Sequence, residues 1–515
     1  MAATHDRLSA LPDATLARVL SHLPTDEAAR TSALSRRWRH VHAAVPVVHL
    51  VDGKTGDRDR DRHRLRHRPV FFDHKVTAAL LCRDPRAPVR ALRLDAFQPT
   101  VPLLDQWLLV ALDAGADEVD VKLRYKGQLH SRNPRLCPFA PHDGASGDFD
   151  HRLLPFVRTP ARLFRTAALR RLRLTQWTLD VPRDVPSFPS METLVLERVM
   201  ARGDALQRLV SGCRNLAALT LEECPTVTVV AVPSARLRSF AIACCHQATR
   251  VALETTTCLR SMRYKGGLPP PGAPFLVSLR RHAGVASVTV DICEGVGERK
   301  RAQVGPIAKV ISRCTNLTSL HLALRPEMAS CGDLFAGVLR GLRRLRRLGL
   351  EGCVSNGHTV AAVIALLQST SKLEALSLFP LHPDPPKEDD AFYVHDSDDE
   401  LCEEHGDDDE LGEEHGDGDD GDKDGGEYRG NVFVPGRMWS TDTRCIKRRL
   451  RRINLVGYRG RRWEKILAKF LLSKAVALEE VKVSVASQLY GRRYEMAREL
   501  ESWRLNRRTR VITCE

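Results

Sequence analysis

The 515-residue sequence has no long apolar segment and few aromatic residues, which make up 5% of the chain. No window approaches the roughly 18 consecutive apolar residues that a membrane-spanning helix requires. The first 25 residues carry acidic and basic side chains where a secretory signal would have an apolar core. We therefore expect no membrane insertion and no secretion, and a cytoplasmic or nuclear location.

The cysteines lack the spacing of a disulfide framework or a zinc ribbon. The chain has 14 cysteines and no Cys-x-x-Cys pair. Cys213, Cys224, Cys314 and Cys353 instead lie three residues before or after the aliphatic triplets described below. We expect reduced thiols that act as small buried hydrophobic groups, and we expect neither a metal site nor a cofactor.

Motifs of catalysis are missing or incomplete. No GxSxG or HExxH sequence occurs, and Gly53-Lys54-Thr55 resembles a phosphate loop in which Val48 stands where the leading glycine is required. We therefore expect no catalytic residues. An enzyme that uses the Lys54 loop is retained as one alternative.

The charges are unevenly distributed. The chain has 79 Lys and Arg against 64 Asp and Glu, yet residues 384–427 contain 22 acidic residues and two lysines. Such a segment cannot bury enough apolar surface to fold. We predict that residues 380–430 are a disordered acidic insert that loops out of a basic, folded body. We further hypothesise that the insert covers the basic strands near residues 343–347 and 447–452.

Triplets of mostly aliphatic residues at offsets 0, +3 and +5 recur along the chain. Eleven begin at Leu169, Met191, Leu216, Leu237, Leu259, Val285, Leu317, Leu345, Leu373, Leu450 and Leu478, and two weaker ones begin at Val89 and Ala116. Residues two apart share one face of a strand, and the third fills the turn before it. Stacked units then form a continuous apolar ladder.

The segments between the triplets complete a repeat unit. Residues 205–210, 307–311 and 360–367 have the apolar spacing of helices. The unit resembles the leucine-rich repeat. The predicted fold class is therefore α/β: a leucine-rich-repeat solenoid, which implies a curved parallel sheet with helices on its convex side. We place the solenoid at residues 89–379 and its terminal repeats at 431–515.

A separate helical module is predicted for residues 1–50. Its first helix carries apolar residues at i, i+3, i+4 and i+7, namely Leu16, Val19, Leu20 and Leu23. Pro24 ends this helix, Thr25 is expected to cap the second, and Trp38 lies on the apolar side of the third. Such a small bundle buries little surface, so its faces need a partner. A basic linker with an entry helix follows at residues 51–88.

Residues 6–46 resemble the F-box of plant F-box proteins. The similarity includes the Leu11-Pro12 start, HLPT at residues 22–25 and TSALSRRWRH at residues 31–40. In addition, residues 453–483 resemble the FBD region that closes many plant F-box/leucine-rich-repeat proteins. The resemblance implies a noncatalytic substrate-recognition subunit of a cullin-based, SCF-type ubiquitin ligase. Its partners would be a Skp-type adaptor, through it a cullin, and an unknown target protein.

Carried onto this chain, the resemblance implies two sets of contact residues. The adaptor-binding set is Leu11, Pro12, Leu16, Val19, Leu20, Leu23, Pro24, Leu34 and Trp38. For the target we select charged residues that flank the core positions of the strands: Arg171, Arg173, Arg263, Lys265, His321 and Arg347. The alternatives are a helical bundle that only caps the solenoid, and a repeat scaffold or basic nucleic-acid-binding protein with a vestigial F-box. We expect no nucleic-acid partner, because no reading motif is present.

Overall fold

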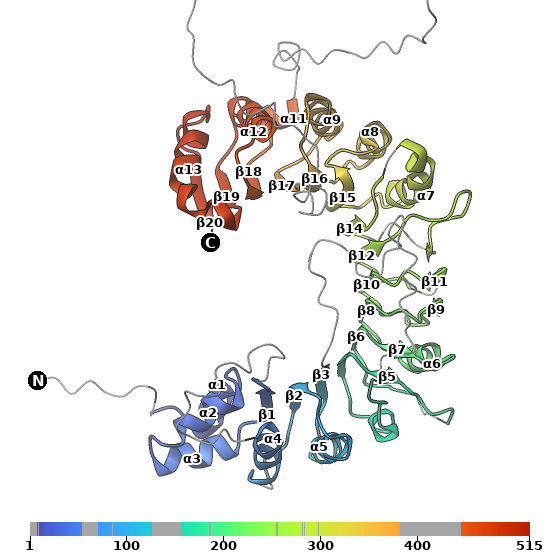
Figure 1. The fold of residues 1–515 in the computed structure, drawn as a ribbon, viewed down its shortest axis with the longest axis vertical. Coiled ribbons are helices and arrows are strands. Elements are labelled where there is room, and N and C mark those ends of the chain that lie inside the picture. The colour runs from blue at the N-terminus through green and yellow to red at the C-terminus, as the bar shows by residue number, and fades with distance from the viewer. Residues whose placement is uncertain are drawn as a thin grey trace, which may run out of the picture.

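The computed structural model describes residues 8, 10–53, 71–84, 86–125, 156–184, 187–253, 256–280, 282, 284–296, 298–381 and 444–514. In these ranges the chain forms an arc with three helices at its N-terminal end (Figure 1). Strands line the inner, concave side of the arc, and helices lie along its outer, convex side. The predicted α/β solenoid with an N-terminal helical module is thereby confirmed.

The helical module consists of α1 (Asp13–Leu20), α2 (Thr25–Thr31) and α3 (Arg36–Ala43). Ser35 caps α3, because its hydroxyl oxygen accepts a hydrogen bond from the backbone N–H of Trp38 at 3.4 Å. A side-chain cap by Thr25 was expected at α2, and this prediction is wrong. The structure places Thr25 inside the first turn of α2, after Pro24.

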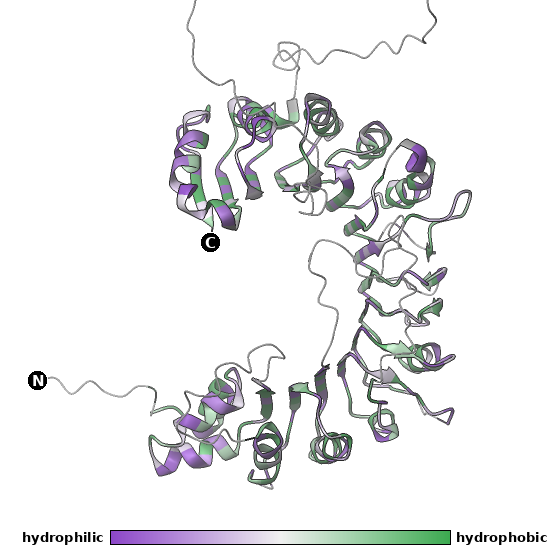
Figure 2. Cartoon of the chain, in the orientation of Figure 1, coloured by the Kyte–Doolittle hydropathy of each residue, from purple (hydrophilic) through white to green (hydrophobic). Residues whose placement is uncertain are grey.

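The main sheet has 15 parallel strands within the described residues. In order along the sheet they are β1 (Val47–Val51), β2 (Ala91–Phe97), β3 (Glu118–Arg124), β4 (Arg171–Thr175), β6 (Thr193–Glu197), β8 (Ala218–Glu222), β10 (Ser239–Ala243), β12 (Ser261–Gly266), β14 (Ser287–Ile292), β15 (Ser319–Glu327), β16 (Arg347–Cys353), β17 (Ala375–Leu381), β18 (Arg452–Tyr458), β19 (Glu480–Val485) and β20 (Arg510–Cys514). Figure 2 shows hydrophobic and hydrophilic residues alternating along these strands.

The predicted triplets form the core of the solenoid. All residues of the thirteen triplets are buried, and equivalent core residues pair across neighbouring strands, as Leu172 does with Leu194 and Leu348 with Leu376. Each such side chain removed from water contributes about 1.5–3 kcal/mol before the entropy of ordering is subtracted. Because a one-residue slip would turn every core residue outward, this ladder holds the register of the whole sheet.

The convex side carries helices near both ends of the arc. They are α4 (Phe72–Leu81), α5 (Val101–Asp113), α6 (Ala205–Gly212), α7 (Arg301–Ser312), α8 (Gly332–Gly341), α9 (Gly357–Gln368), α11 (Arg444–Arg448), α12 (Arg462–Lys474) and α13 (Arg493–Ser502), with short 3₁₀ turns η3 (Ala161–Phe164), η4 (Glu298–Lys300) and η6 (Ser487–Arg492). The three predicted return helices are confirmed as α6, α7 and α9. None of the helices in the described ranges is long and apolar enough to cross a bilayer.

Between α6 and α7 the return segments are short strands instead of helices. They form a three-stranded sheet of β9 (Val229–Ala231), β11 (Arg250–Leu253) and β13 (Val277–Leu279). A second small sheet pairs β5 (Thr178–Leu179) with β7 (Met200–Ala201). Among the described residues, the middle of the arc therefore lacks the helical layer that covers its ends.

The sheet extends beyond the thirteen triplets at both ends. The solenoid begins with β1, one strand earlier than the predicted start at residue 89, because Val45, Val48 and Leu50 repeat the triplet spacing and are buried. At the other end β20 adds a strand whose residues are at most half-buried.

Strands β17 and β18 are neighbours in the sheet, with Leu376 opposite Ile453. Residues 382–443 separate these two strands in sequence. The two flanking repeats nevertheless stack directly on each other. Most of the predicted acidic insert, and hence the hypothesis that it covers basic strands, lies outside the described residues. Lys54 and residues 54–70 of the basic linker also lie outside the described residues.

Candidate partner-binding surfaces

The helical module has its own small core, which includes part of the predicted adaptor-binding set. Leu16, Leu20 and Trp38 are 0%, 3% and 7% exposed and pack with the other buried residues of the module, Ala17, Ala28, Val41 and Val45. Leu16 and Leu20 therefore do not offer a contact surface, which corrects their predicted role. The i, i+4 spacing shows that they share a helix face but does not reveal whether that face meets another helix of the module or another protein.

Other members of the predicted set remain accessible. Val19 at the end of α1 is 45% exposed, Leu34 between α2 and α3 is 69% exposed, and Leu23 is about a third exposed. Leu11 is half-buried against the module's core, Pro12 is exposed and Pro24 is half-buried. Exposed apolar side chains of this size are the anchors that protein interfaces use.

An ion pair and a backbone contact hold the two ends of the module. Arg37 binds Asp13 at 2.7 Å and also donates to the carbonyl oxygen of Leu11, so α3 supports the segment before α1. On the solenoid side, Thr25 accepts a hydrogen bond from the backbone N–H of His49 in β1 at 2.8 Å. The module is thus attached to the first strand of the sheet, where solenoids require a cap.

A pocket of about 440 Å³ lies between the module and the first repeat. The ammonium of Lys75 from α4 binds the carboxylate of Asp26 from α2 at 2.8 Å across it. Burial and the nearby Arg83 guanidinium lower the pKa of His42, and burial also lowers the pKa of Arg83. Both groups border the same pocket, in which Asp26 is the acidic lining residue.

The six predicted target-binding residues all lie on outward-facing positions of the sheet. They sit beside the core residues of β4, β12, β15 and β16 and are exposed or half-buried. The structure does not gather them into one site. Arg171 and Arg173 lie on β4, in the first part of the arc, whereas His321 and Arg347 lie on neighbouring strands β15 and β16.

The arginines of β4 form ion pairs with neighbouring strands. Arg171 binds Glu118 of β3 at 3.0 Å, and Arg173 approaches Glu197 of β6 at 3.4 Å. Both guanidinium groups are more than half exposed, so each pair contributes little stability. Their charge is largely balanced within the sheet, which makes them weaker candidates for target recognition than the sequence suggested.

A denser charge network crosses β12 to β16. Asp291 lies 3.4 Å from Lys265 and 3.1 Å from Arg325. Arg325 also binds Glu351 at 3.0 Å, and His321 lies 3.4 Å from the same carboxylate. The hydrogen bond from His321 lowers the pKa of Glu351, with Arg325 acting in the same direction and burial opposing them. Lys265 and His321 are therefore connected through three intervening side chains.

Beside this network the concave face is hollowed by a pocket of about 560 Å³ that runs from β15 to β20. Gly349 makes room for the imidazole ring of His321 at the border of this pocket, because a Cβ at Gly349 would overlap with that ring. That ring packs edge-on against Phe379, with 5.2 Å between ring centroids. Arg347 lines the pocket and forms no ion pair within the described residues, because its strand neighbours Ser319 and Ala375 carry no charge.

Several lining residues were not among the predicted contacts: Phe379, Arg452, Asn454, Glu480, Lys482 and Ser484. They occupy the outward positions of triplets already recognised in the sequence, and this signal could have found them. Arg263, by contrast, was predicted and is exposed, but it lies outside the pocket on β12. The pocket combines an aromatic ring, basic groups and amide or hydroxyl groups, which suits recognition of a polar protein segment.

The FBD-like region folds as one more repeat: β18, α12 and β19. Glu464 in the first turn of α12 is buried, and its carboxylate accepts hydrogen bonds from the backbone N–H groups of Arg459 and Gly460 at 2.9 and 3.1 Å. Burial raises the pKa of Glu464, although these hydrogen bonds oppose the shift. This carboxylate closes the turn that leads from β18 into α12.

The four cysteines that recur with the repeats differ in burial. Cys213 and Cys314 are fully buried, and each thiol donates to a carbonyl oxygen one helical turn earlier. Burial raises the pKa of Cys213 to about 12 and that of Cys314 to about 11, so both thiols stay protonated and unreactive. Cys224 is also buried, whereas Cys353 is only half-buried.

A helical module joined to a curved parallel sheet of repeats makes this chain similar to F-box and leucine-rich-repeat proteins. Family models support both parts. Residues 8–41 match the F-box domain, and residues 148–278 match the leucine-rich repeats of the FBD-associated F-box protein At5g56370.

Relatives in Arabidopsis thaliana support the same family. F-box/FBD/LRR-repeat protein At4g26340 is 24% identical over 510 residues, covering 96% of this chain and 97% of its own. F-box protein At1g60400 is 31% identical over 46% of this chain and 51% of its own, and F-box/LRR-repeat protein At2g42720 is 28% identical over 46% and 49%. The matched part spans about half the length of several of these relatives. The predicted resemblance to plant F-box/leucine-rich-repeat proteins with an FBD region is confirmed.

Proposed function

We propose that this chain is the substrate-recognition subunit of a cullin-based, SCF-type ubiquitin ligase. The F-box binds a Skp-type adaptor, which joins a cullin, and the repeats hold the protein to be ubiquitinated. The observation that carries the proposal is a helical module with F-box similarity, attached to the solenoid on one side and exposing Leu34 and Val19 elsewhere. The role is noncatalytic, in the cytoplasm or the nucleus.

The adaptor contact rests on the exposed apolar anchors. Burial of a Leu or Val side chain contributes about 1.5–3 kcal/mol, so a few anchors can support an interface. Leu16, Leu20 and Trp38 act indirectly, because their packing sets the positions of the helices that present these anchors.

Target recognition rests on the pocket between β15 and β20. Its Arg347 guanidinium has no acidic partner among the described residues, and the Phe379 ring provides an apolar contact. A target segment with an acidic group beside an apolar side chain would complement both. Charges of both signs alternate along the rest of the concave face, which disfavours a nucleic-acid scaffold because that function requires a continuous basic stripe.

Co-purification with a Skp-type adaptor tests the proposal. The intact chain should bind the adaptor, and Leu34→Asp should weaken binding by about 2 kcal/mol or more, roughly thirtyfold, because it places a charge in a buried contact. Leu34 is 69% exposed, so this change should leave the module folded. A Leu20→Asp variant would be uninformative, since Leu20 lies in the module's core.

Val476→Asp is the matched control, because Val476 is 55% exposed and lies after α12 at the far end of the arc. It should bind like the intact chain. Failure of the folded, intact chain to bind any Skp-type adaptor would refute the proposal, and equal binding by Leu34→Asp would refute the assigned surface.

A further inference from the structure

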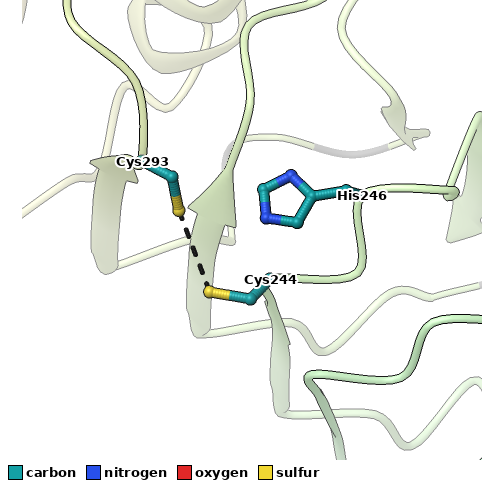
Figure 3. Close-up of side chains that lie close together, drawn as sticks. All are labelled: Cys244, His246 and Cys293. Atoms are coloured by element: carbon teal, nitrogen blue, oxygen red, sulfur yellow. Dashed lines mark hydrogen bonds between the residues drawn. The ribbon is translucent and has the colours of Figure 1, made fainter. Parts of the chain in front are cut away.

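Two cysteines and a histidine from two turns meet at the carboxyl ends of the strands of the main sheet. Cys244 and His246 follow β10, and Cys293 follows β14. Figure 3 shows the sulfur atoms of the cysteines facing each other, with the imidazole ring of His246 beside them. The two Sγ atoms are 3.8 Å apart, and the three donor atoms all lie within 4.8 Å of one another.

The repeat geometry explains how the cysteines meet. Strand β12 separates β10 from β14, and strands two apart in a sheet are about 10 Å from each other. The backbone N–H of Cys244 donates to the carbonyl of Lys265 at 2.7 Å, and that of Cys293 donates to the carbonyl of Gly266 at 2.9 Å. Both cysteines thus border the end of β12, beside Lys265 and Gly266.

The backbone turn that contains Cys244 recurs in other repeats, whereas the cysteine side chain at this position does not. Cys244 has a φ of 53°, and Arg198 and Glu223, which follow earlier strands, have a φ of 52° each. Arg198 and Glu223 bind each other at 2.5 Å across neighbouring repeats. This turn therefore directs side chains toward the next repeat, and at Cys244 it directs a thiol toward another ligand.

The spacing of the sulfur atoms fits a bridging metal ion. Zinc binds thiolates at about 2.3 Å, so tetrahedral geometry places two sulfur ligands about 3.8 Å apart. A disulfide would bring them to about 2.05 Å. Two thiolates with one imidazole form a ligand set that selects zinc among common divalent ions.

The surroundings favour bound metal. Cys244 and Cys293 are 4% and 8% exposed, whereas His246 is half-buried and leaves a route for entry. The backbone carbonyl of Lys265 accepts the hydrogen bond from Cys244, and the ammonium group of Lys265 lies 3.4 Å from Asp291. Glu294 interacts electrostatically with His246 and is held by the backbone N–H of Leu268 at 2.7 Å. A carboxylate near a ligating histidine orients the ring.

We propose that Cys244, His246 and Cys293 bind one zinc ion, with a water molecule in the fourth position. The ion ties two repeats together across β12, in the part of the arc where β9, β11 and β13 replace the convex helices. It stabilises the middle of the solenoid. This site departs from the expectation, drawn from the sequence, that the chain has no metal site.

Metal analysis of the full-length, reduced chain tests the proposal. Protein purified with zinc in the medium should contain about one zinc per chain. After removal of zinc by a chelator, cobalt(II) should produce thiolate-to-metal charge-transfer bands and the d–d bands of a tetrahedral site. Cys244→Ala combined with Cys293→Ala should abolish both signals, and His246→Ala should weaken zinc binding at least tenfold.

The matched control is Cys213→Ala combined with Cys314→Ala, which also removes two buried thiols from the repeats and should retain the metal. If the double cysteine variant does not fold, thermal unfolding of the intact chain still tests the site. Zinc should raise the Tm of the intact chain, and this shift should be lost in His246→Ala. Absence of zinc and cobalt binding by the folded, reduced chain overturns the proposal. So does a Cys244–Cys293 disulfide in protein prepared with zinc. These readouts are independent of adaptor binding.

Discussion

The first and last parts of the concave face share one core and differ in their outward side chains. From β2 to β6, acidic and basic groups on neighbouring strands pair, as Arg171 does with Glu118. From β15 to β20, small residues such as Gly349 and Ser377 open a pocket that Arg347 and Phe379 border. The core of the triplets is equally buried in both parts.

This difference shows that the two sets of positions have separate roles. The core residues hold the register, so the outward residues can change without altering the fold. Recognition must therefore be inferred from the outward positions alone, and the part of the face that has the pocket is the better candidate for binding a target.

The largest expected effect is on stability and is equal in both parts. Leu172→Ala and Leu348→Ala should each lower the free energy of unfolding of the local repeats by about 2–5 kcal/mol, because each leaves a cavity in the ladder. Chemical denaturation, monitored by hydrogen exchange of the β4 and β16 amides, would measure the loss of unfolding free energy. A cost below about 1 kcal/mol in either part would contradict a common core.

The second prediction separates the two parts by function. Arg347→Ala combined with Phe379→Ala should reduce capture of the cellular target by about 2 kcal/mol or more, because both residues border the pocket. The matched variant, Arg171→Ala combined with Arg173→Ala, should capture the target nearly as well as the intact chain. Quantitative proximity labelling of the three proteins would measure capture, and the reverse order of effects would place the target on the first part of the arc.

A third prediction concerns pH. The pKa of Glu351 is lowered by His321 and Arg325, so its contribution to stability is full above the ordinary carboxyl pKa and is lost as pH falls through the lowered value. Glu351→Gln should therefore destabilise the protein by about 1–2 kcal/mol at neutral pH. The difference from the intact chain should shrink as pH falls below the ordinary carboxyl pKa and should vanish below the lowered pKa of Glu351. Chemical denaturation of both proteins across this pH range would measure the difference in unfolding free energy. A difference that does not change with pH would exclude the ionised network.

The smallest effect is expected at the exposed ion pairs. Arg171→Gln should change the free energy of unfolding by less than about 0.5 kcal/mol, and moderate salt should remove the difference. Thermal unfolding at low and high ionic strength would test this. A loss above about 1.5 kcal/mol would show that the first part of the face is also a coupled network.

The repeat fold was predictable from the sequence because the triplet spacing is strict and each core position is aliphatic or large and apolar. The triplets did not identify β1, because Val45 at its first position packs in the core of the helical module, or β20, because Thr513 takes the place of an aliphatic residue. The partition of Leu16 and Leu20 between core and interface could not be predicted, since helical spacing identifies a face and not what covers it.

The candidate sites were less predictable than the fold. The pocket requires a missing side chain at Gly349 and the register of six strands. The proposed zinc site requires Cys244 and Cys293 to meet across β12, although they are 49 residues apart in sequence. The Cys-x-His spacing of Cys244 and His246 was the only local signal, and a two-ligand motif alone is not specific.

The most direct test of the central claim is reconstitution of the purified full-length chain with a Skp-type adaptor and a cullin, followed by mass measurement of the assembly in solution. The account predicts a complex with one copy of each protein, which forms with the Val476→Asp variant and is lost with Leu34→Asp. A folded chain that stays apart from the adaptor would contradict the ligase role and leave a repeat scaffold as the better interpretation.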